Sequence, residues 1–380
     1  MKTASKERLN SIESIKNITG KFIPLLFSTL HYPNFLIYQM HSNKKVFLGL
    51  ENIAGIFTSL KKGFEQNGIS ADFYSLNEHV FGYETDKIIT YSDNSFVRKF
   101  QKFFLILKLL FRYDYFIFDS TGSLLPDYKD IRIFRFFGKK AMVIFTGCDI
   151  RLPEKVEKYK WNPCRNCPDE YKRFTGCVIE TKPAKIREIE RNFDILLSAE
   201  EAAGSLNKEY QAVLFPVDAE KFVYTGVNPS KRLKIMHAPS NPEYKGTKYI
   251  TAAIDRLKKE YDFDFNVITN VKAEELYKEI AAADLVIDQM LVGFYGLLSI
   301  ESMSMGKPVV CYIREDIAIH SPPEMPVINA NPDNLYDVLK NVLSDPSSLI
   351  ETGIRSREYT EKYHNAKIIA GQYYELLERK

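Results

Sequence analysis

Short apolar runs that end in glycine or a polar residue, each followed by a helical pattern, recur along the chain from residue 44 onward. The first run, 44–49, ends in Gly49, and the apolar positions after it keep helical spacing to about residue 66. An Asn-Gly pair ends that helix, and 71–76 is the next predicted strand. This strand–helix–strand order predicts parallel pairing with a right-handed crossover.

The same alternation continues to the end of the chain, and its strands fall into two groups. Because each group alternates with helices, the pattern predicts an α/β fold with a parallel sheet in each of two domains. We place the first domain at 1–215, with an irregular segment at 1–43, the second at 216–365, and a returning helix at 366–380. The further predicted strands are 115–118, 141–145, 194–198, 233–237, 265–268, 285–287 and 309–310, and the further helices are 199–206, 247–259, 273–282, 331–343 and 366–378.

The bulk composition fits a globular protein of two domains, with 380 residues, 45% of them hydrophobic and 27% charged. A net charge of +3 argues against a dedicated nucleic-acid binder. The charge is uneven, because residues 1–140 hold 20 Lys and Arg against 13 Asp and Glu, whereas the remainder holds 32 against 36. We therefore expect an anionic substrate or surface near the first domain.

The membrane and targeting signals of the sequence are weak. No apolar run reaches the length of a transmembrane span, and the charged start lacks the apolar core of a signal peptide. We therefore expect a cytoplasmic protein that reaches a membrane, if at all, at its inner face.

The segment 97–113 is predicted to form a helix that is both basic and aromatic. On a helical projection one half carries Arg98, Lys102, Leu105, Lys108, Leu109 and Arg112. The opposite half, which we expect to face the core, carries Phe100, Phe104, Leu107 and Phe111. A basic face with exposed leucines is typical of a peripheral contact with an anionic membrane surface. The alternative is a basic face that is simply solvated.

Glycines mark the loops that leave three of the predicted strands, at Gly49, Gly122 and Gly147. Ligands of parallel α/β sheets bind beyond the carboxyl ends of the strands. Asp149 and Arg151 follow Gly147 closely, so both are candidate site residues, and we expect Gly122, Gly147 and Arg151 to line a cleft. The alternative for Arg151 is a purely structural pairing with Asp149.

Four of the cysteines lie close together in the chain, at Cys148, Cys164, Cys167 and Cys177. In a cytoplasmic protein cysteines are expected to be thiols or metal ligands rather than disulfides. The Cys164–Cys167 pair has the spacing of a metal knuckle, which favours a structural zinc site. The other two spacings are irregular, and the alternative is a loop of unligated thiols.

The stretch from Gly293 to Tyr312 combines a glycine loop with a short helix between two predicted strands. Gly293 and Gly296 lie in the loop, Glu301 lies on the helix, and Gly306 ends it. A glycine loop that leads into a helix N-terminus directs unpaired backbone N–H groups and the positive end of the helix dipole at one place. That place suits a phosphate. The alternative is an ordinary strand–loop–helix connection.

This stretch resembles the nucleotide-sugar motif of the retaining glycosyltransferases of family 4 (group 1). The matching residues are Tyr295, Gly296 and Glu301, followed by Met303, Gly306, Pro308 and Val309. Upstream, the segment 237–246, which contains Ser240 and Lys245, resembles the Arg/Lys loop of that family. The segments 213–218 and 145–151 resemble its interdomain segment and the loop that faces the donor sugar.

The resemblance covers about residue 44 to the end of the chain and implies the GT-B fold. In that fold two Rossmann-like αβα domains face each other across a cleft, and a C-terminal helix returns to the first domain. The implied donor is a nucleoside-diphosphate sugar, held mainly by the second domain.

The resemblance also implies roles for individual residues. Glu301 would accept hydrogen bonds from the ribose, Lys245 would neutralise the diphosphate, and the N–H groups around Gly296 and Leu297 would hold the phosphates. Asp149 joins Lys245 and Glu301 as an expected catalytic residue. The expected donor-binding set is Gly49, Asn52, Ser240, Lys245, Tyr295, Gly296, Leu297, Leu298 and Glu301.

In the family's usual mechanism the departing phosphate takes the acceptor's proton on the same face of the sugar. The resemblance therefore implies catalysis that requires neither a protein nucleophile nor a metal or other cofactor. Catalysis would rest on stabilising the charge of the leaving group and on closing the cleft. The implied acceptor is a glycan or a lipid-linked sugar, as in the synthesis of bacterial surface polysaccharide or glycolipid.

Two positions depart from the family pattern. Gly293 stands where the first acidic residue of the motif is usual, and Ser240 stands where an Arg usually assists the Lys. Two functions therefore stay open. Lys245, Gly296 and Glu301 favour an active glycosyltransferase, whereas the two departures favour a catalytically silent subunit of the same fold that binds a nucleotide sugar or acts as a scaffold.

Overall fold

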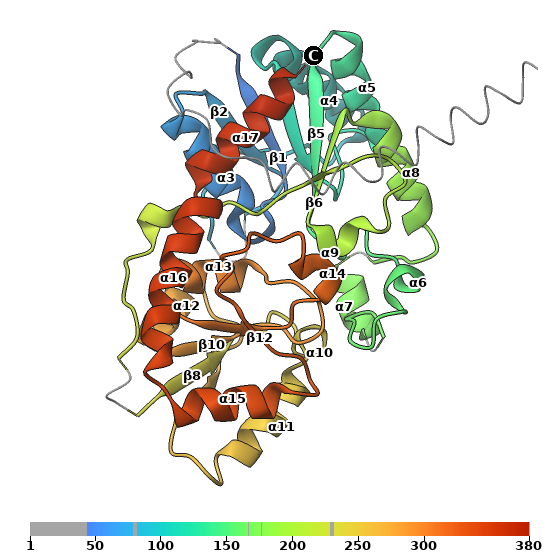
Figure 1. Cartoon of the computed structure of the whole chain (residues 1–380). Coiled ribbons are helices and arrows are strands. Elements are labelled where there is room, and N and C mark those ends of the chain that lie inside the picture. The colour runs from blue at the N-terminus through green and yellow to red at the C-terminus, as the bar shows by residue number, and fades with distance from the viewer. Residues whose placement is uncertain (1–43, 79–81, 166, 176, 229–231, 380) are drawn as a thin grey trace, which may run out of the picture.

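The computed structural model describes residues 44–78, 82–165, 167–175, 177–228 and 232–379. Two parallel sheets, one after the other along the chain, each carry helices on both faces (Figure 1). The predicted α/β fold is therefore confirmed. The irregular segment predicted for 1–43 lies outside the described residues.

The first sheet has seven strands in the order β3-β2-β1-β4-β5-β6-β7, and all of its pairings are parallel. Its central strands are short apolar runs that are buried along their whole length, as parallel strands covered on both faces must be. The strands are β1 Val46–Leu50, β2 Ala71–Ser75, β3 Lys87–Ile88, β4 Tyr115–Asp119, β5 Lys140–Phe145, β6 Ile195–Ser198 and β7 Gln211–Ala212.

Alternate residues of these strands face two different helical layers. Phe47 belongs to the core under α4 (Ser95–Arg112), α5 (Lys129–Phe136) and α8 (Lys182–Asn192), whereas its neighbours Val46 and Leu48 belong to the opposite core. That opposite core lies under α3 (Ile56–Gln66) and α17 (Ala366–Glu378). The short helices of this half are η1 Ile53–Gly55, η2 Pro126–Tyr128, α6 Pro153–Val156, α7 Asp169–Phe174 and α9 Glu200–Ala203.

The last helix of the chain, α17, packs against α3 of the first half (Figure 1). A Cβ atom at Gly63 would lie 2.0 Å from the carbonyl oxygen of Ala366, so the glycine lets the two helices approach closely. The chain crosses between the halves twice at one place, where the Val217 amide donates to the His364 carbonyl over 2.8 Å. The predicted return of the C-terminal helix matches this packing, while the limits drawn at 215 and 365 stay a prediction.

The second sheet has five parallel strands in the order β12-β11-β10-β8-β9. One hydrophobic core lies between this sheet and the helices α11 and α15. The other lies between the sheet and α12, α13 and α16. The strands are β8 Lys234–His237, β9 Asp264–Val267, β10 Leu285–Ile287, β11 Val309–Cys311 and β12 Ile328–Asn329. The helices are η3 Ala219–Lys221, α10 Pro242–Lys245, α11 Thr247–Leu257, α12 Ala273–Ala282, α13 Leu297–Ser304, α14 Glu315–Ala318, α15 Leu335–Ser344 and α16 Ser348–Tyr363.

The orientation predicted for the basic helix, α4, is wrong. Leu109 is fully buried and Leu105 packs on the core, whereas Phe100, Phe104 and Phe111 are 49%, 61% and 84% exposed. Packed aromatic rings fill the core beneath α4, where Phe47 contacts Tyr74, Tyr113 and Phe116. Aliphatic side chains fill the remaining space, and the phenylalanines of α4 are left outside. Across the described helices, none is long and apolar enough to cross a membrane.

Candidate functional site

A buried polar cluster lies where β10 ends and α13 begins. Asp288 directly follows β10, and its carboxylate is fully buried. It accepts hydrogen bonds from Lys245 Nζ at 2.8 Å, from the Gly296 amide at 3.1 Å and from Ser299 Oγ at 2.6 Å. Burial on its own would raise the pKa of Asp288, but these three donors hold it below its ordinary value.

Lys245 reaches this cluster from the end of α10. Its ammonium donates a second hydrogen bond to Gln289 Oε1, at 2.6 Å, and the side chain is 12% exposed. A Cβ atom at Gly296 would lie 3.5 Å from Lys245 Nζ, so the glycine brings the backbone of the loop close to the charge. An ammonium has three N–H donors, and these two bonds leave one for a ligand.

The first amides of α13 point from the same place. The Gly296 amide is used by Asp288, which corrects the expectation that it is unpaired. For Leu297 and Leu298, the described part of the chain supplies no hydrogen-bond acceptor to the amide, as is usual for the first turn of a helix. Both residues are partly exposed. The N-terminus of α13 therefore offers two amides and one ammonium donor to an anion.

Glu301 lies one turn further along α13. Its carboxylate accepts a hydrogen bond from Tyr277 Oη over 3.0 Å, and the residue is 8% exposed. Desolvation raises the pKa of Glu301 to about 7, although the Tyr277 hydroxyl and the charge of Lys221 oppose the shift. The Lys221 ammonium lies 4.9 Å from the Tyr277 ring centre and 5.9 Å from that of Tyr83, a residue of the first half of the chain. Both halves of the molecule thus contribute to the surroundings of Glu301.

Position 293, the first of the two departures from the family motif, requires a glycine because the side chain of Arg314 lies against it. The φ of Gly293 is +90°, and a Cβ atom there would lie 2.5 Å from Arg314 Cγ. Arg314 is 7% exposed, and its guanidinium donates to the Glu201 carbonyl and pairs with Asp316. The space that an acidic side chain would occupy in the motif is therefore filled by Arg314.

Arg151 has a different partner from the one considered in the sequence. It forms a fully buried ion pair with Glu201 at 2.5 Å and donates to Tyr244 Oη at 2.9 Å. Because Tyr244 precedes Lys245 in α10, this contact joins the two halves beside the buried polar cluster around Asp288. Gly147, at φ +125°, lies against the pair, since a Cβ atom there would be 3.0 Å from the Arg151 guanidinium.

The Asp149 carboxylate is hydrogen-bonded within its own loop. Its carboxylate accepts from the amides of Thr146 and Gly147, at 3.0 and 2.7 Å, and from Ser120 Oγ. Asp149 therefore fixes the turn after β5.

Other expected donor-binding residues have structural contacts instead. The buried Asn52 side chain accepts from the Phe57 amide and donates to Thr58, so it ties the loop after β1 to the first turn of α3. Tyr295 is 3% exposed, and its hydroxyl bonds Tyr359 and His364 at 2.9 Å each. Gly49 lies inside β1, and Ser240 is exposed. The structure brings together Lys245, Gly296, Leu297, Leu298 and Glu301, and leaves Asn52 and Tyr295 out.

The four clustered cysteines are unoxidised and partly exposed. Lys182 Nζ donates to Cys177 Sγ over 2.9 Å, and an Arg151 nitrogen lies 3.5 Å from Cys148 Sγ. Within the described ranges, no three side chains of His, Cys, Asp or Glu are arranged to hold a metal ion. The zinc site predicted from Cys148, Cys164, Cys167 and Cys177 stays a prediction.

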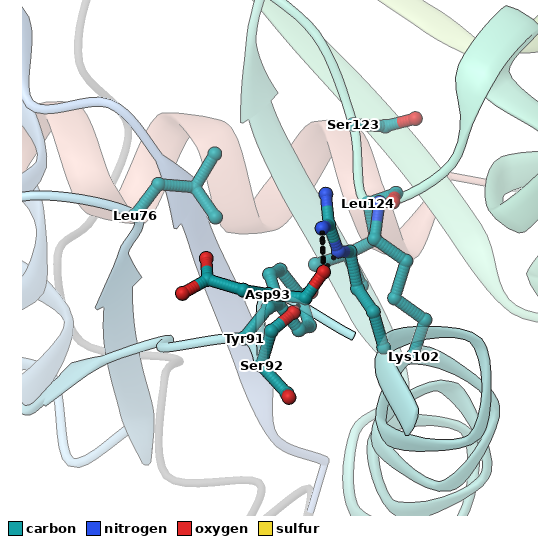
Figure 2. Close-up of a pocket in the computed structure, with 8 residues that line it drawn as sticks. Leu76, Tyr91, Ser92, Asp93, Lys102, Ser123 and Leu124 are labelled. Atoms are coloured by element: carbon teal, nitrogen blue, oxygen red, sulfur yellow. Dashed lines mark hydrogen bonds between the residues drawn. The ribbon is translucent and has the colours of Figure 1, made fainter. Parts of the chain in front are cut away.

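Two adjoining cavities open on the first half, beyond the carboxyl ends of its strands. The larger has a volume of about 890 Å³ and includes Gly122 in its wall. The smaller, of about 320 Å³, is drawn in Figure 2 with Leu76, Tyr91 and Asp93 among its lining residues. Lys102, Ser123 and Leu124 line both, so the two cavities share a wall.

The sequence did not predict which side chains contact Lys245 and Glu301 in the candidate site. Asp288 directly follows the predicted strand 285–287, and a carboxylate at the end of a parallel strand is a signal that could have found it. Tyr277 carries no such signal, because its contact with Glu301 depends on how α12 packs against α13.

Known proteins were compared with the chain at the levels of sequence and structure. No protein-family model and no curated protein matches it. Solved structures do: a sucrose-phosphate synthase from Thermosynechococcus elongatus superposes with a TM-score of 0.57 at 14% identity, over 88% of this chain and 98% of that one. The chain has the GT-B fold.

Two further structures extend this likeness. Anabaena HepE in complex with UDP-glucose gives a TM-score of 0.56 at 12% identity, over 88% of this chain and 99% of HepE. WaaG, a glycosyltransferase involved in lipopolysaccharide biosynthesis, gives 0.54 at 13%, over 88% of this chain and all of WaaG. At such identities the likeness establishes the fold.

Proposed function

We propose that the chain is a retaining glycosyltransferase that moves a sugar from a nucleoside-diphosphate sugar to a glycan or lipid-linked acceptor. The observation that carries the proposal is the N-terminus of α13. There, Lys245 and the amides of Leu297 and Leu298 converge on one place, with Glu301 a turn away.

The diphosphate would bind where these donors converge. A helix N-terminus favours negative charge, and α13 is eight residues long and mostly buried. The remaining N–H of the Lys245 ammonium would donate to a phosphate oxygen while Asp288 keeps the side chain in position. Binding a dianion beside a lysine already paired with one carboxylate requires the helix dipole and both amides to contribute.

The ribose would be recognised by Glu301. A carboxylate accepts from two vicinal hydroxyls, and burial makes such bonds strong. Tyr277 and Tyr83 lie beside it and would flank the nucleoside. Uridine diphosphate sugars are the first donors to test, because HepE was solved with UDP-glucose.

Transfer would proceed without a protein nucleophile. The bond from the sugar's anomeric carbon to the diphosphate breaks, the acceptor oxygen forms the new bond on the same face, and its proton passes to the leaving phosphate. Lys245 and the α13 amides stabilise the charge that develops on that phosphate. In this proposal no metal or other cofactor is required.

The acceptor would bind to the first domain. Sugar transfer would take place at the cytoplasmic face of a membrane, in polysaccharide or glycolipid synthesis. WaaG, whose pathway is lipopolysaccharide biosynthesis, shares the fold and supports this choice. The partners would be the nucleotide sugar, the acceptor and an anionic membrane surface, with no nucleic acid.

A catalytically silent nucleotide-sugar-binding or scaffolding protein is the second candidate. It is favoured by Asp288, which already binds Lys245 and the Gly296 amide, and by Arg314, which fills the place of the usual acidic residue.

A panel of nucleotide sugars separates the two candidates. We expect a uridine diphosphate sugar to raise the melting temperature and to be hydrolysed slowly without acceptor. Stabilisation without any hydrolysis or transfer would favour the silent protein. A panel in which no donor stabilises the chain would remove the basis of the enzyme.

A further inference from the structure

Five phenylalanines form an exposed stripe along α4, which we call the α4 aromatic stripe: Phe96, Phe100, Phe103, Phe104 and Phe111. Their exposed fractions run from 49% to 84%. At 100° per residue, the five positions fall within a sector of about 100° on the helix. Solvent-facing helices of soluble proteins rarely carry such a stripe, so it indicates a contact with an apolar partner.

The charged residues beside the stripe indicate what kind of apolar partner it contacts. Helix α4 carries five Lys and Arg residues and no Asp or Glu. Lys99 and Lys108, both exposed, flank the stripe on its two sides. Aromatic rings between lysines suit the boundary between acyl chains and anionic headgroups, where the rings are half-buried and the ammonium groups reach phosphates. An anionic bilayer surface therefore matches both the apolar and the charged parts of the helix.

The opposite side of α4 borders the two cavities. Lys102 lies in the wall shared by both, where its ammonium donates to the Leu124 carbonyl at 2.8 Å and lies 5.2 Å from the Tyr91 ring centre. Lys185, from α8, lines the larger cavity and donates to the Thr121 carbonyl at 3.2 Å.

These two lysines differ from the other cations around the larger cavity. Arg132 pairs with Glu188, and Lys129 pairs with Asp127. Lys102 and Lys185 have no carboxylate within 4.0 Å among the residues that the structure describes. Each ammonium keeps donors that its one carbonyl acceptor does not use. The cavity therefore presents two ammonium groups that form no ion pair within 4.0 Å among the described residues, and it lies beside the helix that carries the aromatic stripe.

We propose that the first-domain cavity binds the phosphate of a lipid-borne acceptor through Lys102 and Lys185, while the α4 aromatic stripe rests in the anionic bilayer that carries that lipid. The inference rests on the proposed glycosyl transfer, because it names the acceptor class of that reaction. Binding requires no chemistry beyond ion pairing, and the transferred sugar would join a group of the acceptor that extends toward α13.

The headgroup is tested in solution with farnesyl phosphate and with farnesol, by calorimetric titration of the full chain. We expect the phosphate to bind, and Lys102→Gln and Lys185→Gln each to weaken it by roughly tenfold or more, as for a lost charge-assisted hydrogen bond. Lys62→Gln, on the exposed side of α3 and outside both cavities, is the matched control and should bind as wild type. Equal affinity for farnesol, or an equal loss in the control, would overturn the cavity assignment.

The source of the phosphate is tested with inorganic phosphate and with vesicles. Inorganic phosphate that binds as tightly as farnesyl phosphate would overturn the lipid-borne source. Flotation with vesicles of phosphatidylcholine and phosphatidylglycerol should recover the wild-type chain and lose the double variant Phe103→Ser, Phe104→Ser. Ile319→Ser, which removes an even more exposed apolar side chain directly after α14, should float normally. Flotation of the double variant at wild-type levels would overturn the role of the stripe.

Thermal stabilisation by UDP-glucose, measured on the same variants, separates this inference from the proposed function. Stabilisation by the sugar nucleotide without binding of farnesyl phosphate would overturn the acceptor class and leave the transfer reaction standing. Binding of farnesyl phosphate without a response to any nucleotide sugar would overturn the transfer reaction and leave a lipid-phosphate site.

Discussion

Lys245 and Asp288 form an ion pair at the N-terminus of α13 whose carboxylate is completely buried. Nζ and Oδ1 are 2.8 Å apart, and the two residues are separated by 43 positions in the chain. Lys172 and Asp169 form a pair with the same 2.8 Å distance on the surface, where the aspartate is 81% exposed. Burial, rather than distance, therefore distinguishes the pair at the proposed donor site.

We predict that Asp288→Asn lowers the free energy of unfolding by about 3 kcal/mol at pH 7, because it leaves a buried ammonium without its counter-charge. Urea unfolding checks the value. Asp169→Asn is the matched control and should have no measurable cost.

The pH dependence of Asp288 has a definite sign. Its folded pKa lies below the ordinary value of 3.8, so the pair stabilises the fold above that value and the stabilisation is lost as pH falls through the folded pKa. The wild type should therefore lose stability faster than Asp288→Asn in this acid range. Parallel pH curves for the two proteins would contradict the account.

Glu301 should show the opposite pH trend. Its folded pKa of about 7 lies above the ordinary 4.5, so the unfolded chain releases the proton first. Stability should therefore fall as pH rises from about 4.5 to about 7 and then level off. We predict that Glu301→Gln is more stable than wild type at pH 8, by on the order of 3 kcal/mol, and about equal at pH 4. Unfolding curves at the two pH values check this, and a variant less stable at both would refute the assignment.

Gly293 should tolerate no side chain. We predict that Gly293→Ala costs about 1–3 kcal/mol more than Gly138→Ala, because both positions have positive φ but only Gly293 faces Arg314. At Gly138 no atom lies within 4 Å of the added Cβ, so that variant reports the backbone strain alone. Equal costs, measured by urea unfolding, would show that the loop moves away from Arg314.

The hydroxyl of Tyr373 is buried with no partner among the described residues. We predict that Tyr373→Phe raises the free energy of unfolding by about 1 kcal/mol, because it removes an unsatisfied polar group. Tyr295→Phe should instead lower it, since that hydroxyl bonds Tyr359 and His364. Changes of the same sign in both variants would contradict this reading of the two hydroxyls.

The fold was predictable because its signals are local. Apolar runs such as 115–118 and 141–145 became β4 and β5, and the predicted helix 366–378 is α17 to the residue. The face of α4 was not predictable in the same way, because both of its halves carry apolar side chains. Rings of β1 and β4 beneath the helix decide which half is buried, and these belong to distant segments.

The site was predictable in part for the same reason. Gly296 and Glu301 follow from one contiguous motif, and Lys245 from another. Asp288 as the partner of Lys245, and Arg314 as the reason for Gly293, depend on packing between segments.

The most direct test of the central claim is the affinity for UDP-glucose, or for whichever sugar nucleotide stabilises the chain, in wild type and three variants. We predict that Lys245→Ala weakens binding at least tenfold, as for a lost charge-assisted hydrogen bond, while Lys248→Ala, an exposed lysine three residues on, binds as wild type. Glu301→Gln should also lose binding although it is the more stable protein at pH 8, which separates loss of the site from loss of the fold. Wild-type affinity in Lys245→Ala and Glu301→Gln would contradict the account.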